Sequence, residues 1–287
     1  MRYLLILILI PGIQFVLGKL LPSFIPDSFS YWKMYLVVLL QQFFSFCVPV
    51  LFIYPKEKYL SKKDCTFYKK TDIFRLAAIG ICLQILGTVL NMPIGMLLQH
   101  FGHQLPHTFP IPKTALEFLA QTLAVCLAPA IMEEIFFRRI VFNEISVFSK
   151  KAAVFFSALL FSMAHFSFFN IAATFFIGLI LGLLRCRKVS VLECIVTHFT
   201  VNFSASLLNM GFKNPVFSEL FQRYYPLSVF LALVLLFVIF PKKEELADCA
   251  DKSFVVPRKN YFIHLLKNPL FYIYCILFCV LGVYQLC

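Results

Sequence analysis

The placement of apolar residues constrains this chain more than any other feature of its sequence. A helix needs about twenty predominantly apolar residues to cross a hydrocarbon core about 30 Å thick. Eight or nine candidate stretches follow one another, at 3–20, 34–54, 76–98, 114–142, 152–169, 171–184, 191–210, 227–240 and 269–287. No segment between them has room for a sizeable soluble domain. The pattern predicts an all-α fold, a polytopic transmembrane bundle with about eight or nine spans.

The composition supports this prediction. Of the 287 residues 61% are hydrophobic and only 14% are charged, and the mean hydropathy is +0.85. An average soluble domain is far less apolar. The first stretch follows Arg2 and also has the features of a secretory signal peptide, but the small-residue cleavage site around Gly18 is poor, so we expect a retained first span.

The positive charge is distributed unevenly between the two sides of the predicted bundle. Nine alternating spans put 21 of the 26 lysines and arginines on the side of the N-terminus and 5 on the other. The positive-inside rule assigns the richer side to the cytoplasm. The net charge of +12 is therefore explained by topology and needs no nucleic-acid partner. The six lysines between Lys56 and Lys70 can also attract anionic lipid, and a solvated loop without a lipid role is the favoured alternative. We expect an integral multi-pass protein of a bacterial plasma membrane, or of the endoplasmic reticulum in a eukaryote.

Several ionisable side chains lie inside the apolar stretches. Such groups are expensive in hydrocarbon, so each one is a functional-site hypothesis. Glu134 and Arg138 are four residues apart and can pair on one helical face. Glu133 is rotated by about 100° from Glu134 and escapes that pairing. The alternative is a solvated helix end at the membrane interface, where a cluster of charges is cheap.

Two further spans carry histidine. His165 follows Phe161 by four residues, and His198 and Asn202 have the same separation, so each pair lies on one helical face. Taken singly, His165 could be a hydrogen-bonded histidine inside the bundle, and His198 with Asn202 could be a packing contact between helices.

Together these side chains can form a hydrolytic site. Glu133 could deprotonate a water, and His165 could orient that water or bind a metal that polarises it. His198 and Asn202 could stabilise the oxyanion formed at a scissile carbonyl. A Zn²⁺ ion is a conditional cofactor, with Glu133, His165 and His198 as its ligands, because an amide such as Asn202 is a poor zinc ligand.

The order EExxxR, FxxxH and HxxxN on successive spans resembles the CPBP family of intramembrane proteases, which includes type II CAAX prenyl endopeptidases and bacterial relatives linked to bacteriocin processing and self-immunity. The similar stretch runs from about Thr114 to Gly211. The resemblance implies an endopeptidase with protein or peptide substrates at the bilayer, CAAX-like or unmodified. It implies Glu133 as the catalytic carboxylate, supported by Glu134 and Arg138, with a remaining site of His165, His198 and Asn202. Bacterial members commonly have Gly where this chain has Arg139.

The resemblance divides the chain into three regions. We expect N-terminal spans and a basic cytoplasmic loop at 1–110, the catalytic helical core at 111–211 and C-terminal spans at 212–287. A rival metal site at His100, His103 and His107 is disfavoured, because the prolines around it interrupt a helix and no carboxylate or thiolate accompanies it. The alternative function is a non-proteolytic carrier or self-immunity protein with a buried Glu/His site. The inverted repeats expected of a carrier are not found in the sequence.

Overall fold

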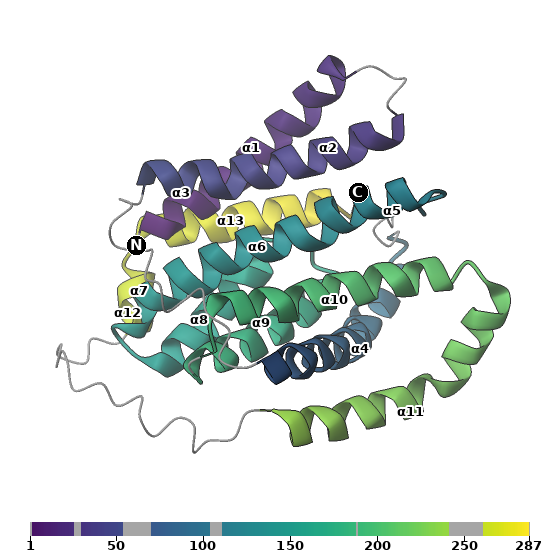
Figure 1. Cartoon of the computed structure of the whole chain (residues 1–287). Helices are drawn as coiled ribbons and strands as arrows, with labels where there is room; N and C mark the ends of the chain where they lie inside the picture. Colours follow the sequence, from purple (N-terminus) through teal and green to yellow (C-terminus); the bar gives the residue numbers. More distant parts are fainter. Residues whose placement is uncertain are drawn as a thin grey trace.

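The computed structural model describes residues 2–25, 30–53, 70–103, 111–187, 189–240 and 261–286, and every regular element in these ranges is a helix (Figure 1). One helical segment occupies each of the nine predicted apolar stretches. Six of these segments are long and apolar enough to cross a membrane, and two more are shorter apolar helices. The all-α transmembrane prediction is confirmed. His107, Lys188, Cys287 and the basic segments 54–69 and 241–260 lie outside the described residues.

The two ends of the chain form one side of the bundle. Helix α1 (Arg2–Phe24) packs against α13 (Pro269–Tyr284) and against the second span, which consists of α2 (Ser30–Gln42), the π-helical η2 (Phe43–Cys47) and α3 (Val48–Ile53). The hydroxyl groups of Tyr3 and Tyr261 share a hydrogen bond that joins α1 to the short helix α12 (Tyr261–Leu266). The N-terminus, α7 and α12 lie toward one end of the bundle, and α5 and the C-terminus lie toward the other (Figure 1).

One long helical stretch runs through the centre of the molecule. It consists of α5 (Ala115–Gln121), η5 (Thr122–Leu127), α6 (Ala128–Glu134), η6 (Ile135–Val141) and α7 (Phe142–Ser146). A capping box between Thr114 and Glu117 fixes its start, since each side chain satisfies a backbone N–H of the other residue. Pro129 has no N–H to donate and removes one helical hydrogen bond just after η5. The sequence predicts this stretch as one helix. The structure differs from that prediction in the two π-helical segments, η5 and η6, that lie within it.

The remaining helices are α4 (Lys70–His100), α8 (Lys150–Met163), α9 (Ile171–Cys186), α10 (Val191–Gly211) and α11 (Pro215–Ile239). Of these, α8, α9 and α10 pack against this stretch, α4 packs against α9 and α10, and α11 packs against α4. Helices α8 and α9 approach closely because Gly178 and Gly182, four residues apart, face α8: a Cβ at Gly178 would lie 3.0 Å from the Cα of Ala158. Small residues at this spacing are typical of helix contacts in membranes. Helix α10 packs between α4 and α6.

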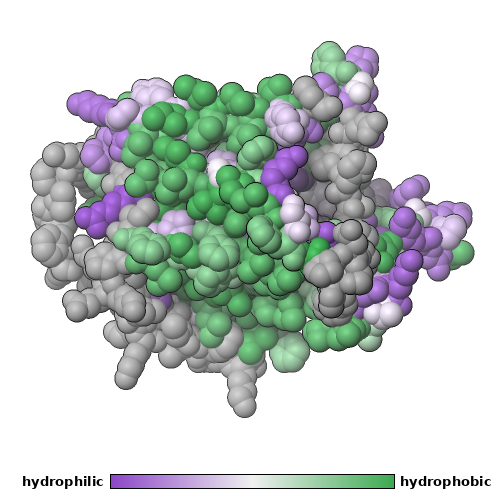
Figure 2. All heavy atoms as spheres, turned by 90° about the horizontal axis from the view of Figure 1, so that it is seen from above, coloured by the Kyte–Doolittle hydropathy of each residue, from purple (hydrophilic) through white to green (hydrophobic). Residues whose placement is uncertain are grey.

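The outer surface is strongly apolar. Figure 2 shows a broad hydrophobic band on the face that carries α1 and α2, with hydrophilic residues toward its two sides. Helix α11 has one buried residue, Ala232, and exposes Phe230 and Phe237. This surface suits hydrocarbon, whereas the charged pair Glu134 and Arg138 is completely buried. The bundle therefore has an apolar outside and holds this charged pair in a largely apolar interior.

Candidate active site

The structure brings four of the predicted site residues to one cavity of about 380 Å³. Glu133 from α6, His165 from the turn after α8, and His198 and Asn202 from α10 all line it. Glu134 and Arg138 are not part of the lining and lie behind it, with both side chains fully buried. The roles of these six residues remain predictions.

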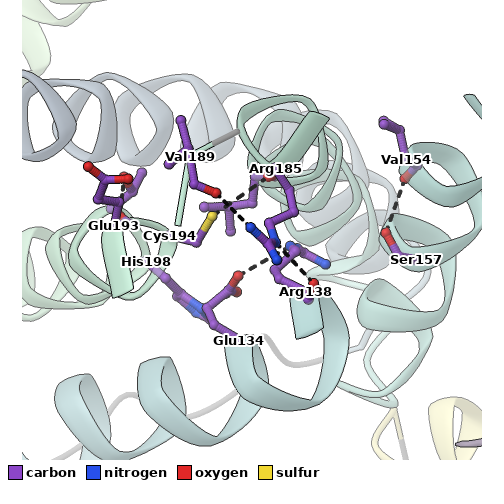
Figure 3. Close-up of polar contacts among 11 residues, drawn as sticks. Glu134, Arg138, Val154, Ser157, Arg185, Val189, Glu193, Cys194 and His198 are labelled. Carbon is purple, nitrogen blue, oxygen red and sulfur yellow. Dashed lines mark hydrogen bonds and ion pairs between the residues drawn. The ribbon is translucent and has the colours of Figure 1, made fainter. Parts of the chain in front are cut away.

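Glu134 connects two of the site elements. Its Oε2 lies 3.2 Å from Nε of Arg138 across the junction of α6 and η6. Its Oε1 lies 2.9 Å from Nδ1 of His198 on α10. Figure 3 shows Glu134 with Arg138 on one side and His198 on the other. The four-residue spacing predicts the ion pair, but the contact between Glu134 and His198 is not expected from the sequence.

Arg138 is held from several directions. Its guanidinium carbon lies 5.1 Å from the centre of the Phe161 ring, a distance at which a cation is attracted to an aromatic face. Its backbone carbonyl accepts a hydrogen bond of 3.3 Å from Nε of Arg185, and a second nitrogen of Arg185 donates to the carbonyl of Val189 at 3.0 Å (Figure 3). Arg185 thus ties the end of α9 and the start of α10 to η6.

The contact with Glu134 restricts the chemistry of His198. A carboxylate that is paired with an arginine only accepts hydrogen bonds, so Nδ1 of His198 carries a hydrogen. Nε2 is then the ring nitrogen left for a ligand. It accepts when the ring is neutral and donates only when the ring is an imidazolium. The predicted role of His198 as an oxyanion donor therefore requires the protonated ring, for which Glu134 supplies the counter-charge.

His165 lies outside the helix in which the sequence predicts it. Helix α8 ends at Met163, and not near residue 169 as expected, and His165 lies in the following turn. Nδ1 of its ring lies 2.9 Å from the carbonyl oxygen of Phe161, one of the carbonyls that a helix end leaves without a partner. The next residue, Phe166, has a positive φ of 48° that a continuing helix does not allow.

The Phe161 ring packs between the functional side chains. Its centre lies 4.9 Å from the ring of His165 and 5.6 Å from the ring of His198, and its own exposure is 1%. The spacing FxxxH places Phe161 and His165 on one face of a helix. In the structure they meet through the turn at the helix end instead.

Glu133 is the carboxylate that faces the cavity. Its side chain is 7% exposed, and its Oε2 has no hydrogen-bond partner in the described part of the chain. A buried oxygen without a partner is costly and is typical of a group that awaits a ligand or a water. Glu133 and Glu134 thus differ as the sequence predicts: one is held in contacts, and the other is available.

The cavity also contains residues that the sequence analysis does not single out. Gln42 from α2 and Gln121 from α5 line it, as do Ser206 and Asn209 from α10. The signal that draws attention to Asn202, a polar side chain within an apolar span, applies equally to the two glutamines.

The conditional zinc site is not assembled. Among the described residues no three His, Cys, Asp or Glu side chains lie close enough to hold one metal ion, so Glu133, His165 and His198 do not form a ligand set in this geometry. In the histidine-rich loop, Nδ1 of His103 contacts the carbonyl of Leu286, and His107 is not described.

Fold and site together define a class: an integral membrane protein, helical throughout its described parts, with a cavity lined by a buried carboxylate, two histidines and an amide. Residues 115–204 match the family model described as type II CAAX prenyl endopeptidase Rce1-like. The predicted resemblance is confirmed for this third of the chain, which contains all six candidate residues, and the match supports an endopeptidase. No curated protein and no solved structure matches the chain. Arg139, at the position of the departure from bacterial members, is buried within η6.

Proposed function

We propose that the chain is an intramembrane endopeptidase that hydrolyses peptide bonds of membrane-associated substrates. The observation that carries the proposal is the position of Glu133: a buried carboxylate, one oxygen of which has no partner among the described residues, on the wall of the cavity that His165, His198 and Asn202 also line. The match of residues 115–204 to an endopeptidase family supports the same reaction.

In this mechanism Glu133 takes a proton from a water, and the resulting hydroxide attacks the scissile carbonyl. With Nδ1 of His165 on the carbonyl of Phe161, its Nε2 carries a lone pair when the ring is neutral and can orient the water. The amide of Asn202 and Nε2 of a protonated His198 donate to the oxyanion. Glu133 then returns the proton to the leaving amine as the tetrahedral intermediate collapses.

Glu133→Gln tests the proposal because it keeps the shape of the side chain and removes its basicity. We expect the purified variant to fold and to bind peptide but to leave almost no cleavage of a tagged substrate. Asn202→Ala should retain a weak activity, about a hundredfold below wild type, because it removes one oxyanion donor and leaves the base.

Glu219→Gln is the matched control, since Glu219 lies on α11 outside the cavity, and it should cleave at the wild-type rate. Cleavage by Glu133→Gln at the wild-type rate would show that Glu133 is not the base. Substrate binding without any cleavage by the wild-type protein would favour the carrier or immunity function instead.

A chelator adds a second test of the mechanism. Because no three metal-ligating side chains converge in the described residues, we expect the cleavage rate to be the same with and without EDTA. A loss of activity that added Zn²⁺ restores would assign a metal to the reaction.

A further inference from the structure

The cavity is long in one direction. On the central helix its lining runs from Gln121 through Val125 and Pro129 to Glu133, four residues apart at each step. At about 1.5 Å per residue, the twelve steps from Gln121 to Glu133 span about 18 Å. On α10 the lining from His198 to Asn209 spans about 16 Å. The cavity is therefore a groove along two helices.

The two helical walls run in opposite directions. His198, near the start of α10, contacts Glu134 near the end of α6, whereas the rings of Phe118 and Phe203 lie 6.0 Å apart farther along. The ionisable residues Glu133 and His198 thus lie at one end of the groove, and Gln121 lies toward the other.

Two glutamine side chains, Gln42 and Gln121, line the groove. Gln121 is 2% exposed, and its Oε1 has no hydrogen-bond partner among the described residues. Oε1 of Gln42, on the wall that α2 provides, is buried and equally without a partner in that part of the chain. Two unpaired amide oxygens in an apolar surrounding destabilise the protein unless a ligand donates to them.

The local backbone singles out the same residues. Within the described ranges there are three π-helical segments, η2, η5 and η6. They begin directly after Gln42, Gln121 and Glu134, respectively. Segments of π-helix are frequent at functional sites, because their wider turn changes the direction of neighbouring side chains. Glu134 belongs to the candidate site, and the same device occurs at the two glutamines.

We propose that this groove binds the main chain of an extended peptide, and that Gln42 and Gln121 bind this peptide by hydrogen bonds to its backbone amides. The inference rests on the proposed endopeptidase function. An extended chain covers about 3.3 Å per residue, so the groove holds about five residues on one side of the scissile bond. A side-chain amide offers both a donor and an acceptor and therefore matches a peptide bond whatever the side chains of the substrate are.

A purely apolar ligand, such as an isoprenoid chain, fits this wall poorly. Such a ligand would fill the space but leave both glutamine oxygens unpaired. A peptide supplies N–H groups along its whole length. The groove therefore favours the peptide part of a substrate over any attached lipid.

The experiment uses full-length protein in nanodiscs. A mixture of decapeptides is selected for binding to the Glu133→Gln protein, and the best binder, labelled with a fluorophore, is the probe. Each of its backbone amides is then replaced in turn by an ester, which removes one N–H donor. Gln121→Met and Gln42→Met are made in the Glu133→Gln background and remove the amide while keeping its length. Gln84→Met is the matched control, because Gln84 lies on α4, bonds to Thr88 and is not part of the groove.

We expect Gln121→Met and Gln42→Met to raise the Kd of the probe by about 3- to 10-fold each, and Gln84→Met to leave it unchanged. One ester should weaken binding to the parent protein by a similar factor and have no further effect in Gln121→Met. Thermal stability of Gln121→Met should equal or exceed that of the parent, because an unpaired amide is removed.

Three results would overturn the inference. The first is that no decapeptide binds, and the second is that Gln42→Met and Gln121→Met leave the Kd unchanged, as Gln84→Met does. The third is that every ester raises the Kd by the same factor in Gln121→Met as in the parent protein. If a farnesyl-cysteine ester displaced the labelled probe more strongly than the unlabelled peptide does, and Gln121→Met did not change this displacement, the groove would be assigned to an apolar chain. The proposed endopeptidase function is tested separately, by cleavage with the wild-type protein. If the wild-type protein binds the probe but does not cleave it, the proposed function fails while the peptide groove stands.

Discussion

Glu134 is the residue on which the buried charges of the site depend. It contacts a permanent cation, Arg138, and a histidine that can become one, His198. Removing one member of such a group strands the others in a medium of low dielectric constant, which is more destabilising than replacing the pair as a whole.

Arg138→Ala should therefore lower the free energy of unfolding by about 3 kcal/mol or more, since both partners of the ion pair are completely buried. The measurement is the thermal unfolding midpoint of purified protein, together with the folded yield. The double variant Glu134→Gln with Arg138→Met, which leaves no unpaired charge at these positions, should regain part of the loss. An unfolding midpoint equal to wild type for Arg138→Ala would show that water reaches the pair.

A kinetic cycle tests whether Glu134 acts through His198. If the carboxylate stabilises the imidazolium that donates to the oxyanion, Glu134→Gln should lower kcat by about tenfold or more with little change in KM. His198→Gln should lower kcat by about a hundredfold. The double variant should then be no slower than His198→Gln alone. Fully multiplicative effects would mean that the two residues act independently.

At the scale of single residues, the sequence predicts which side chains meet but not how. The spacing of Glu134 and Arg138 predicts their ion pair, because four residues along a helix bring side chains together. It cannot predict that Nδ1 of His198 contacts Glu134, since this contact depends on how α10 packs against α6. The position of His165 differs from the expectation because α8 ends at Met163, about six residues before the predicted end near 169, and the His165 side chain contacts the backbone carbonyl of Phe161.

Among the elements, the π-helical segments are the part of the fold that hydrophobic periodicity cannot reveal. A π-helical turn widens the helix locally without changing its apolar character, so η5 and η6 lie within a stretch that reads as one span. The close contact of α8 with α9 is more visible in the sequence, because Gly178 and Gly182 have the spacing of small residues at a helix interface.

Gly178→Ala tests that contact. Its added Cβ would lie 3.0 Å from the Cα of Ala158 and 3.2 Å from the Phe161 ring, so α8 and α9 have to separate. We expect a loss of about 1–3 kcal/mol in unfolding free energy. Activity should fall as well, because Phe161 contacts His165 and His198. Gly12→Ala in α1 is the control: nothing lies within 4 Å of its added Cβ, and the variant should be as stable as wild type or slightly more stable. Equal unfolding midpoints for the two variants would contradict the close packing.

At the scale of the whole molecule, segments from the two ends of the chain contact each other. Tyr3 in α1 and Tyr261 in α12 share a hydrogen bond, and the rings of Phe148 and Phe156 pack on Tyr261 with centres 5.3 and 4.9 Å away. This contact ties the N-terminal span to the segment that precedes the last span. Tyr3 and Tyr261 lie outside residues 115–204, the region matched to the endopeptidase family, whereas Phe148 and Phe156 lie inside it, so this contact joins the outer spans to the matched core.

This junction predicts a loss of stability at alkaline pH. Burial raises the pKa of the Tyr261 phenol from 10.0 to about 12. Between these values the folded protein keeps a proton that the unfolded chain releases, so the contribution of this phenol to stability is fully present below pH 10 and is lost as the pH rises toward 12, by about 2–3 kcal/mol in all. The unfolding midpoint of wild type should decrease more steeply across this range than that of Tyr261→Phe, which cannot titrate. Parallel curves for the two proteins would show that the phenol is open to solvent and that the two chain ends are not held together at this point.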